Sequence, residues 1–148
     1  MRLKVGTYLP NFAYGDDGID HRARLRHWIM RAEELGFDSI WVTDHLLRAW
    51  DMYAVTWLEP MASLCFAAAI TERVQLGPGV LLLPLRNPVI LAKEVATLQN
   101  LSAGRFIFGV GTGHYAPDWR PPELAYRSGA GEPTRCSTSS GGWSGARP

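Results

Sequence analysis

The sequence predicts an α/β fold of about four parallel strands and three helices, either the N-terminal half of a TIM (β/α)8 barrel or part of a doubly wound sheet. Strand and helix patterns alternate strictly over residues 1–113, which favours parallel strands joined by right-handed crossovers. The stretch 74–83 is dense in Val and Leu, as expected of a strand buried on both faces. Each unit takes roughly 30 residues, so four units amount to half of a barrel of about 250 residues.

The first unit combines a short strand over residues 3–9 with a helix that follows a glycine-containing loop. Asp20 is expected to cap this helix, and Gly36, just past its end, suits the left-handed conformation of a helix terminus. The buried face is predicted from apolar residues that recur at helical spacing: Leu25, Trp28, Ile29, Ala32 and Leu35.

The second unit has a strand over residues 38–43, which Asp44 and His45 follow immediately. Residues 46–57 carry several aromatic side chains and are expected to form a loop. A helix is predicted over residues 58–71, and its apolar run is far shorter than the ~20 residues that span a bilayer.

The third unit begins with the strand over residues 74–83. Asn87 and Pro88 then predict a helix start, because Asn is a favoured cap and Pro suits the first helical position. This helix should run to about Leu101 and end at Gly104, and a fourth strand is predicted over residues 105–110.

Composition excludes several classes of partner. The 148 residues carry 15 basic and 14 acidic side chains, a net charge of +1, which gives no electrostatic reason to expect nucleic acid or an acidic membrane. The two cysteines do not make a disulfide framework, and the N-terminus lacks the apolar core of a signal peptide, so a cytoplasmic protein is expected.

Familiar catalytic motifs are not present in the sequence. No HxH, HExxH or CxxC spacing occurs, so no metal site is predicted, and no GxSxG elbow indicates a hydrolase nucleophile. Residues 109–113, GVGTG, look superficially like a dinucleotide loop, but Pro117 and the prolines that follow discourage the helix that such a loop must open. A strand end without side chains, which lets backbone approach a ligand or a neighbouring strand, is the better interpretation. Tyr8, Pro10 and Asn11, at the end of the first strand, could line the same rim, although simple packing explains them at least as well.

Four segments of residues 1–118 resemble the luciferase-like monooxygenase family. They read VGTYLPNF, AEELGFDSIWVTDH, LGPGVLLLPLRNPVILAKEVATLQNLSAGRF and FGVGTG. The resemblance implies a TIM barrel that binds FMN or the deazaflavin coenzyme F-420 at the C-terminal ends of its strands. It also implies a flavin- or deazaflavin-dependent oxidoreductase, either an FMN-dependent monooxygenase or an F-420-dependent dehydrogenase or reductase, that acts on a small-molecule substrate.

The resemblance also indicates site residues. Asp44 and His45 match positions that line the pocket, which suggests catalytic roles, although a pair of loop residues capping the next segment would look the same. Gly79 and Val80 match the place where several family members have a non-proline cis peptide beneath the cofactor ring, although an ordinary strand glycine would also fit. Gly111 is expected beside them as a cofactor-binding backbone position.

The chain departs from the family after residue 118. Nothing that resembles the fifth to eighth strands follows, and residues 119–148 are a low-complexity tail rich in Gly, Ser and Pro. Codon freedom permits another reading frame over residues 124–146 that encodes an amphipathic helix similar to the family's, so a frameshift near residues 118–124 is one hypothesis. The alternative to an oxidoreductase is therefore a non-catalytic half-barrel fragment that self-associates through its open edges.

Overall fold

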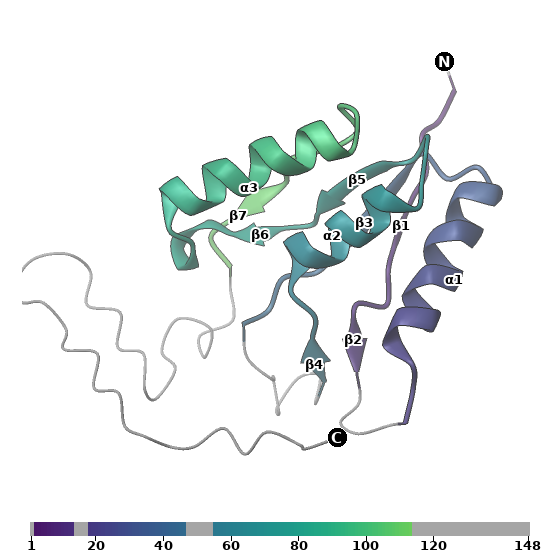
Figure 1. Cartoon of the computed structure of the whole chain (residues 1–148), viewed down its shortest axis with the longest axis horizontal. Helices are drawn as coiled ribbons and strands as arrows, with labels where there is room; N and C mark the ends of the chain where they lie inside the picture. The colour runs from purple at the N-terminus through teal and green to yellow at the C-terminus, as the bar shows by residue number, and fades with distance from the viewer. Residues whose placement is uncertain (1, 14–17, 47–54, 114–148) are drawn as a thin grey trace, which may run out of the picture.

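The computed structural model describes residues 2–13, 18–46 and 55–113 (Figure 1). The predicted tail, residues 119–148, and most of the aromatic loop lie outside the described residues. In chain order the elements are β1 (Gly6–Tyr8), β2 (Phe12–Ala13), α1 (His21–Glu34), β3 (Ser39–Val42), β4 (Thr56–Trp57), α2 (Pro60–Ala69), β5 (Gln75–Pro78), β6 (Leu81–Leu82), a 3-10 turn (Leu83–Leu85), α3 (Pro88–Leu101) and β7 (Val110–Gly111).

The strands form a parallel sheet, which confirms the predicted fold class. Its order is β1-β3-β5, and β6 continues the path of β5 and pairs in parallel with β7. A bridge between Leu76 and Phe106 brings the stretch that precedes β7 alongside β5, so the fourth predicted strand lies where the pattern requires it. The third predicted strand is divided in two at Gly79–Val80, between β5 and β6.

The predicted helix ends are confirmed because they depend on local chemistry. The Asp20 carboxylate accepts a hydrogen bond from the Ala23 N–H at 2.9 Å and caps α1. The Asn87 side chain accepts bonds from two N–H groups of the first turn of α3, with Pro88 at the first helical position. Gly36 and Gly104 adopt the left-handed conformation, with φ of +80° and +82°.

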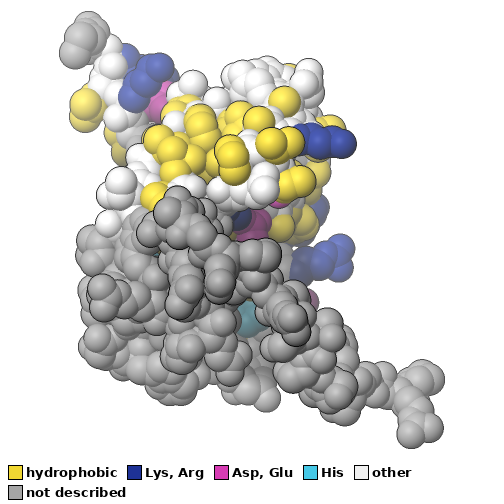
Figure 2. Space-filling model, turned by 90° about the vertical axis from the view of Figure 1, so that its left-hand side faces the viewer, with side chains coloured by type: hydrophobic (Ala, Val, Ile, Leu, Met, Phe, Trp, Pro, Cys, Tyr) yellow, Lys and Arg dark blue, Asp and Glu magenta, His cyan; other side chains and the backbone are white. Residues whose placement is uncertain are grey.

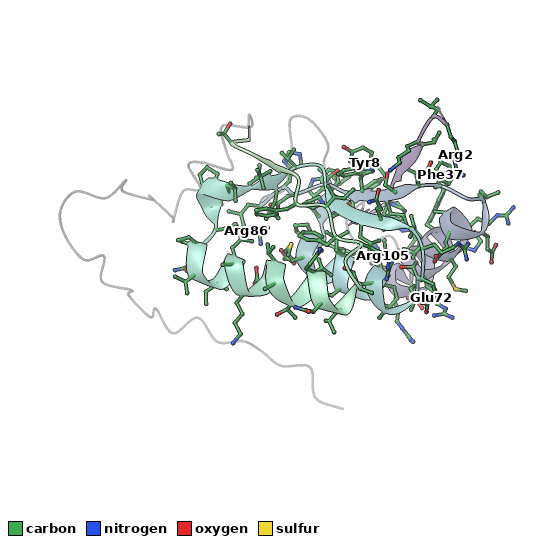
Figure 3. All side chains as sticks on the ribbon, turned by 90° about the horizontal axis from the view of Figure 1, so that it is seen from above. Arg2, Tyr8, Phe37, Glu72, Arg86 and Arg105 are labelled. Atoms are coloured by element: carbon green, nitrogen blue, oxygen red, sulfur yellow. The ribbon has the colours of Figure 1, made fainter. Side chains whose placement is uncertain are left out.

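All three helices lie on one side of the strands, and the hydrophobic core fills the space between them (Figure 3). The fully buried members include Ile29 of α1, Ile40 of β3, Leu64 of α2, Leu76 of β5 and Leu98 of α3. Of the face predicted for α1, Trp28 and Leu35 are exposed, so that expectation was wrong. The buried stripe is limited to one side of the helix, Leu25, Ile29 and Ala32, because only the sheet and its neighbouring elements cover it. None of the helices in the described ranges is long and apolar enough to cross a bilayer.

The opposite side of the sheet is the side that would face the interior of a barrel, and here it is built from two rows of residues. The strand registers place Gly6, Ser39 and Gln75 in one row and Tyr8, Trp41 and Gly77 in the next: the first members belong to β1, the second to β3 and the third to β5. We call this surface the inner face. The indole N–H of Trp41 donates to the Ser39 hydroxyl at 2.9 Å, and the indole lies across the glycines of both neighbouring strands.

One small sheet was not predicted. β2 and β4 pair antiparallel, with Phe12 opposite Trp57 and their rings 5.4 Å apart. Each strand is only two residues long, so neither carries a strand pattern that could be recognised in the sequence. The pairing joins the segment after β1 to the segment before α2, and it lies at the carboxyl ends of the parallel strands.

Arg105 connects the amino end of β5 to the ends of α2 and α3. Its five N–H groups donate to five oxygens, at distances from 2.8 to 3.2 Å. The acceptors lie at the end of α2, at the start of β5 and at the end of α3: the carbonyls of Ala68, Thr71, Val74 and Ser102 and the hydroxyl of Thr71. A guanidinium has five donors, so every one of them is used.

Asp38 holds the segment before β1 against β3, and its carboxylate makes stability depend on pH. The backbone N–H of Val5 and the guanidinium of Arg2 donate to it at 2.8 and 2.6 Å, and together they lower its pKa. A carboxyl whose pKa is lower in the folded state stabilises the fold above its unfolded pKa of about 3.9 and loses this effect as the pH falls further. We therefore expect Asp38→Asn to lower the thermal midpoint at pH 7 and to matter less at pH 3.

Thermal unfolding of both proteins at the two pH values measures this effect. Glu34→Gln is the matched control, because Glu34 forms an exposed ion pair with Arg31 and such pairs contribute little. An equal difference between the original protein and Asp38→Asn at pH 7 and pH 3 would contradict the assignment.

Candidate active site

The five residues singled out from the sequence lie at the carboxyl edge of the sheet, on adjacent strands. Asp44 and His45 directly follow the segment of β3, Gly79 and Val80 connect β5 to β6, and Gly111 ends β7. Backbone bonds fix this neighbourhood: the Gly79 N–H donates to the Val42 carbonyl at 2.8 Å, and β6 pairs with β7 so that Leu82 lies opposite Gly111. The topology therefore brings together residues that are up to 67 positions apart, from Asp44 to Gly111.

Asp44 is a buried carboxylate that joins β3 to the segment after β5. It is 7% exposed, and its Oδ2 accepts a hydrogen bond from the Leu82 N–H at 2.9 Å and another from the Arg86 guanidinium, also at 2.9 Å. Arg86 in turn donates to Glu59 at 2.7 Å, and the other Glu59 oxygen caps α2 through the Ala62 N–H. One cation thus connects the end of β3, the start of α2 and the 3-10 turn.

The charge of Arg86 is stabilised by its two carboxylate partners. Burial alone would lower the pKa of the guanidinium, but the hydrogen bonds that it donates to Glu59 and Asp44 outweigh this effect and raise the pKa. Arg86 stays charged at any pH at which the protein folds, so the connection is a fixed structural element rather than a titrating one.

His45 lies in a cavity next to this ion-pair network. Its ring centroid is 5.1 Å from that of Trp57, with the planes tilted by 40°. A cavity of about 230 Å³ is lined by both rings together with Asp44, Leu46, Glu59, Pro60, Leu85 and Arg86. A histidine in such a position can donate a hydrogen bond to a ligand or exchange a proton with it.

Gly79 and Val80 form the part of the site that belongs to the inner face. Their peptide bond is cis, as the family resemblance implied. The Tyr8 hydroxyl donates to the Gly79 carbonyl at 3.1 Å, and a Cβ at Gly79 would lie 2.6 Å from that hydroxyl oxygen. A Cβ at Gly111 would likewise lie 2.6 Å from a Val80 methyl group. Glycine at both positions therefore leaves room for the Tyr8 hydroxyl and the Val80 side chain.

These two parts adjoin each other but are not one cavity. The cavity around His45 does not include Gly79, Val80 or Gly111, and the bond from the Leu82 N–H to Asp44 marks the boundary between the two. The strip from Tyr8 through Gly79 to Val80 presents an aromatic ring, a flat backbone and an exposed apolar side chain. Such a surface suits the face of a planar ring system, and His45 supplies a polar group at its border.

Asn11, which was expected either to line the rim or simply to pack, helps to organise this site. It is fully buried, and its side chain donates to the Thr43 carbonyl at 2.8 Å and accepts from the Thr43 N–H at 3.3 Å, next to Asp44. Its own carbonyl accepts from the Leu58 N–H at 2.8 Å. Sequence reasoning missed Arg86 and Glu59, because no motif or spacing marks either of them.

A second cavity lies at the other end of the sheet. It measures about 370 Å³ and is lined mostly by charged side chains that precede β1, β3 and β5, among them Arg2, Lys4, Asp38 and Arg73. It contains none of the predicted site residues. Within the described ranges, no group of three or more His, Cys, Asp or Glu side chains could hold a metal ion.

Comparison with known proteins agrees with the resemblance. The model of the luciferase-like monooxygenase family matches residues 1–123. An F-420-dependent glucose-6-phosphate dehydrogenase from Kineococcus radiotolerans is 42% identical over 91 residues, which cover 61% of this chain and 27% of that protein. The alkanal monooxygenase alpha chain of Photorhabdus luminescens is 29% identical over 127 residues, which cover 80% of this chain and 32% of that protein.

Solved structures of the same kind share the fold. The coenzyme F-420-dependent tetrahydromethanopterin reductase from Methanopyrus kandleri superposes with a TM-score of 0.60 at 32% identity, covering 78% of this chain and 29% of that chain. The FMN complex of the oxygenating constituent of 3,6-diketocamphane monooxygenase from Pseudomonas putida gives a TM-score of 0.65 at 24% identity, covering 78% and 31%. The chain therefore spans about a third or less of the length of the relatives it matches.

Proposed function

Because this chain belongs to the luciferase-like monooxygenase family, whose members are flavin- or F-420-dependent oxidoreductases, we propose that it provides the amino-terminal part of an F-420 site. The observation that carries the proposal is the arrangement at the carboxyl edge of the sheet. The strip at Gly79, Val80 and Gly111 adjoins the cavity of about 230 Å³ that His45 lines.

The deazaflavin is preferred over FMN on the basis of sequence similarity. The relatives named as F-420-dependent glucose-6-phosphate dehydrogenases from three organisms are 42%, 41% and 42% identical to this chain, whereas three relatives named as monooxygenases are 31%, 29% and 36% identical. An FMN-dependent monooxygenase is the second candidate, because those relatives match more of the chain, 79% or 80% of it.

Each of the described side chains at this site would have a distinct role in the reaction. When bound, F-420 would supply the hydride chemistry, and the protein would orient the substrate and exclude water. His45 would hold or release the proton that accompanies this chemistry at one of its ring nitrogens. Asp44 would act as a positioning residue, because its Oδ2 already binds the Leu82 N–H and Arg86. Tyr8 would fix the Gly79 carbonyl and so hold the strip in place.

Equilibrium titration with F-420, and separately with FMN, tests the proposal. The original chain should bind F-420 saturably and more tightly than FMN, with a ligand absorbance or fluorescence change as the readout. We expect His45→Ala to weaken F-420 binding about tenfold, which corresponds to the loss of about 1.4 kcal/mol, or one hydrogen bond to the ligand.

His27→Ala is the matched control, because His27 lies on the exposed surface of α1, away from the predicted site residues. It should bind F-420 like the original chain. Tighter binding of FMN than of F-420 would favour the monooxygenase candidate. The absence of saturable binding of either cofactor, or an equal loss in both histidine variants, would overturn the proposed function.

A further inference from the structure

The sheet has two open sides and an uncovered inner face. Within the described ranges, β1 is bonded only to β3 and β7 only to β6, so each outer strand has one free edge. Free edges of this kind pair readily with other strands. On the inner face, Tyr8 is 57% exposed and stands at the open β1 end of the row that it forms with Trp41 and Gly77.

The β7 side carries apolar side chains that nothing in the described chain covers. Phe108 and Val110 are 44% and 40% exposed, although they occupy the stretch that pairs with β5 and β6. Ile90 and Leu101, three helical turns apart and so on one flank of α3, are also exposed. Figure 2 views the molecule from the end at which α3 begins, and hydrophobic side chains are gathered on that face as well. Apolar surface of this extent marks a contact region.

The β1 side is apolar as well. Val5, just before β1, is exposed, and so is Trp28 on α1, the helix that follows the strand. Trp28 was expected in the core of this chain, and its exposure is accounted for if another helix packs beside α1. Both open sides of the sheet therefore have the composition of an interface rather than of a solvated surface.

We propose that a second copy of this chain covers the inner face and closes the barrel. A two-fold axis along the barrel would set the β1 side of each copy against the β7 side of the other, so that both open edges are satisfied at once. The strands stay parallel under such a rotation. Two copies provide eight strand positions, the number whose interior is just filled by side chains.

A second copy is the preferred occupant because the chain has two different open sides. A single two-fold rotation places the β1 side of each copy against the β7 side of the other, which makes two identical contacts. In the longer relatives the rest of the polypeptide is available for this purpose, since the matched part is only 27% of the dehydrogenase from Kineococcus radiotolerans. In the dimer, the carboxyl edges of both copies would lie on one rim. That rim would then carry two copies of the strip at Gly79 and Val80.

Sedimentation velocity of the 148-residue chain over a range of concentrations tests this proposal. The original chain should sediment as a dimer, and Phe108→Lys should raise the dimer dissociation constant at least tenfold, because it places a charge in the closed β7 side. Val89→Lys is the matched control: Val89 is 75% exposed and lies on the face of α3 opposite the core, so its dimer should be unchanged. Far-ultraviolet circular dichroism verifies that both variants fold.

Hydrogen exchange of the backbone amides provides a second measurement. Amides of β1 and β7 should become better protected as the protein concentration rises. A chain that stays monomeric at all concentrations, or a dimer that Phe108→Lys and Val89→Lys weaken equally, would overturn the proposal. Protection that is present in a monomer and does not depend on concentration would also overturn it and would indicate that another segment of the same chain covers the face. Cofactor binding and dimerisation are measured in separate experiments, so the failure of one proposal does not decide the other.

Discussion

Arg105→Met is expected to lower the free energy of unfolding by about 3–5 kcal/mol, a large fraction of what holds a domain of this size together. The guanidinium satisfies five oxygens at the ends of α2 and α3 and the start of β5. Methionine can occupy much of the same volume but donates no hydrogen bond, so several partly buried carbonyls would lose their partner. Urea unfolding followed by circular dichroism measures the change.

Two further variants identify the cause of that loss. Arg105→Lys should also be strongly destabilising, because an ammonium has only three donors and cannot reach five acceptors in a planar fork. Arg31→Met is the control, since Arg31 forms only an exposed ion pair with Glu34, and it should change stability by less than about 0.5 kcal/mol. Similar losses for Arg105→Met and Arg31→Met would show that the five bonds contribute nothing specific.

Gly109→Ala is expected to cost about 2–4 kcal/mol, the second large effect. A Cβ at this position would lie 2.3 Å from the carbonyl oxygen of Pro78, which belongs to the backbone of β5 and cannot rotate away. The strand that leads into β7 would have to move outward, which breaks the bond from the Leu81 N–H to the Gly109 carbonyl. Thermal and urea unfolding of the variant measure the cost.

Gly36→Ala separates lack of space from backbone conformation. Gly36 has φ of +80° and nothing within 4 Å of its Cβ position, so alanine there meets no atom but adopts a left-handed conformation at a cost of about 1–2 kcal/mol. At Gly109, by contrast, the obstacle is an atom in the way, the Pro78 carbonyl oxygen 2.3 Å from the Cβ position. If Gly109→Ala is no more destabilising than Gly36→Ala, the close approach of the two strands is not as rigid as its geometry indicates.

The sequence predicted those parts of the fold that depend on neighbouring residues. Asp20, Asn87 and Pro88 start helices through bonds within the first turn, and Gly36 and Gly104 end them through their own backbone conformation. The strand positions followed from runs of apolar residues and from strict alternation with helices. The candidate residues Asp44 and His45 could be placed at one edge of the sheet because the carboxyl ends of parallel strands share that edge.

The rest depends on contacts between distant segments. Nothing near Arg86 in the chain indicates that Asp44 and Glu59 will pair with it, 42 and 27 positions away. The five hydrogen bonds of Arg105 could not be predicted either, because its segment was noted only for its resemblance to a family. The exposure of Trp28 was missed because a helical pattern shows which residues are apolar, whereas the arrangement of neighbours decides which of them are covered.

The glycines of the inner face differ in which atoms exclude a larger side chain. This difference determines which of these positions can be substituted. At Gly6 the nearest atoms to a new Cβ belong to the side chains of Ser39 and Trp41, at 2.5 and 2.6 Å, so a smaller residue at either position would release the constraint. At Gly77 the nearest atom is the backbone oxygen of Ile107, at 2.8 Å, and no exchange of side chains removes it. Gly6 is therefore conditional on its partners and can change together with them, whereas Gly77 is fixed by the fold itself.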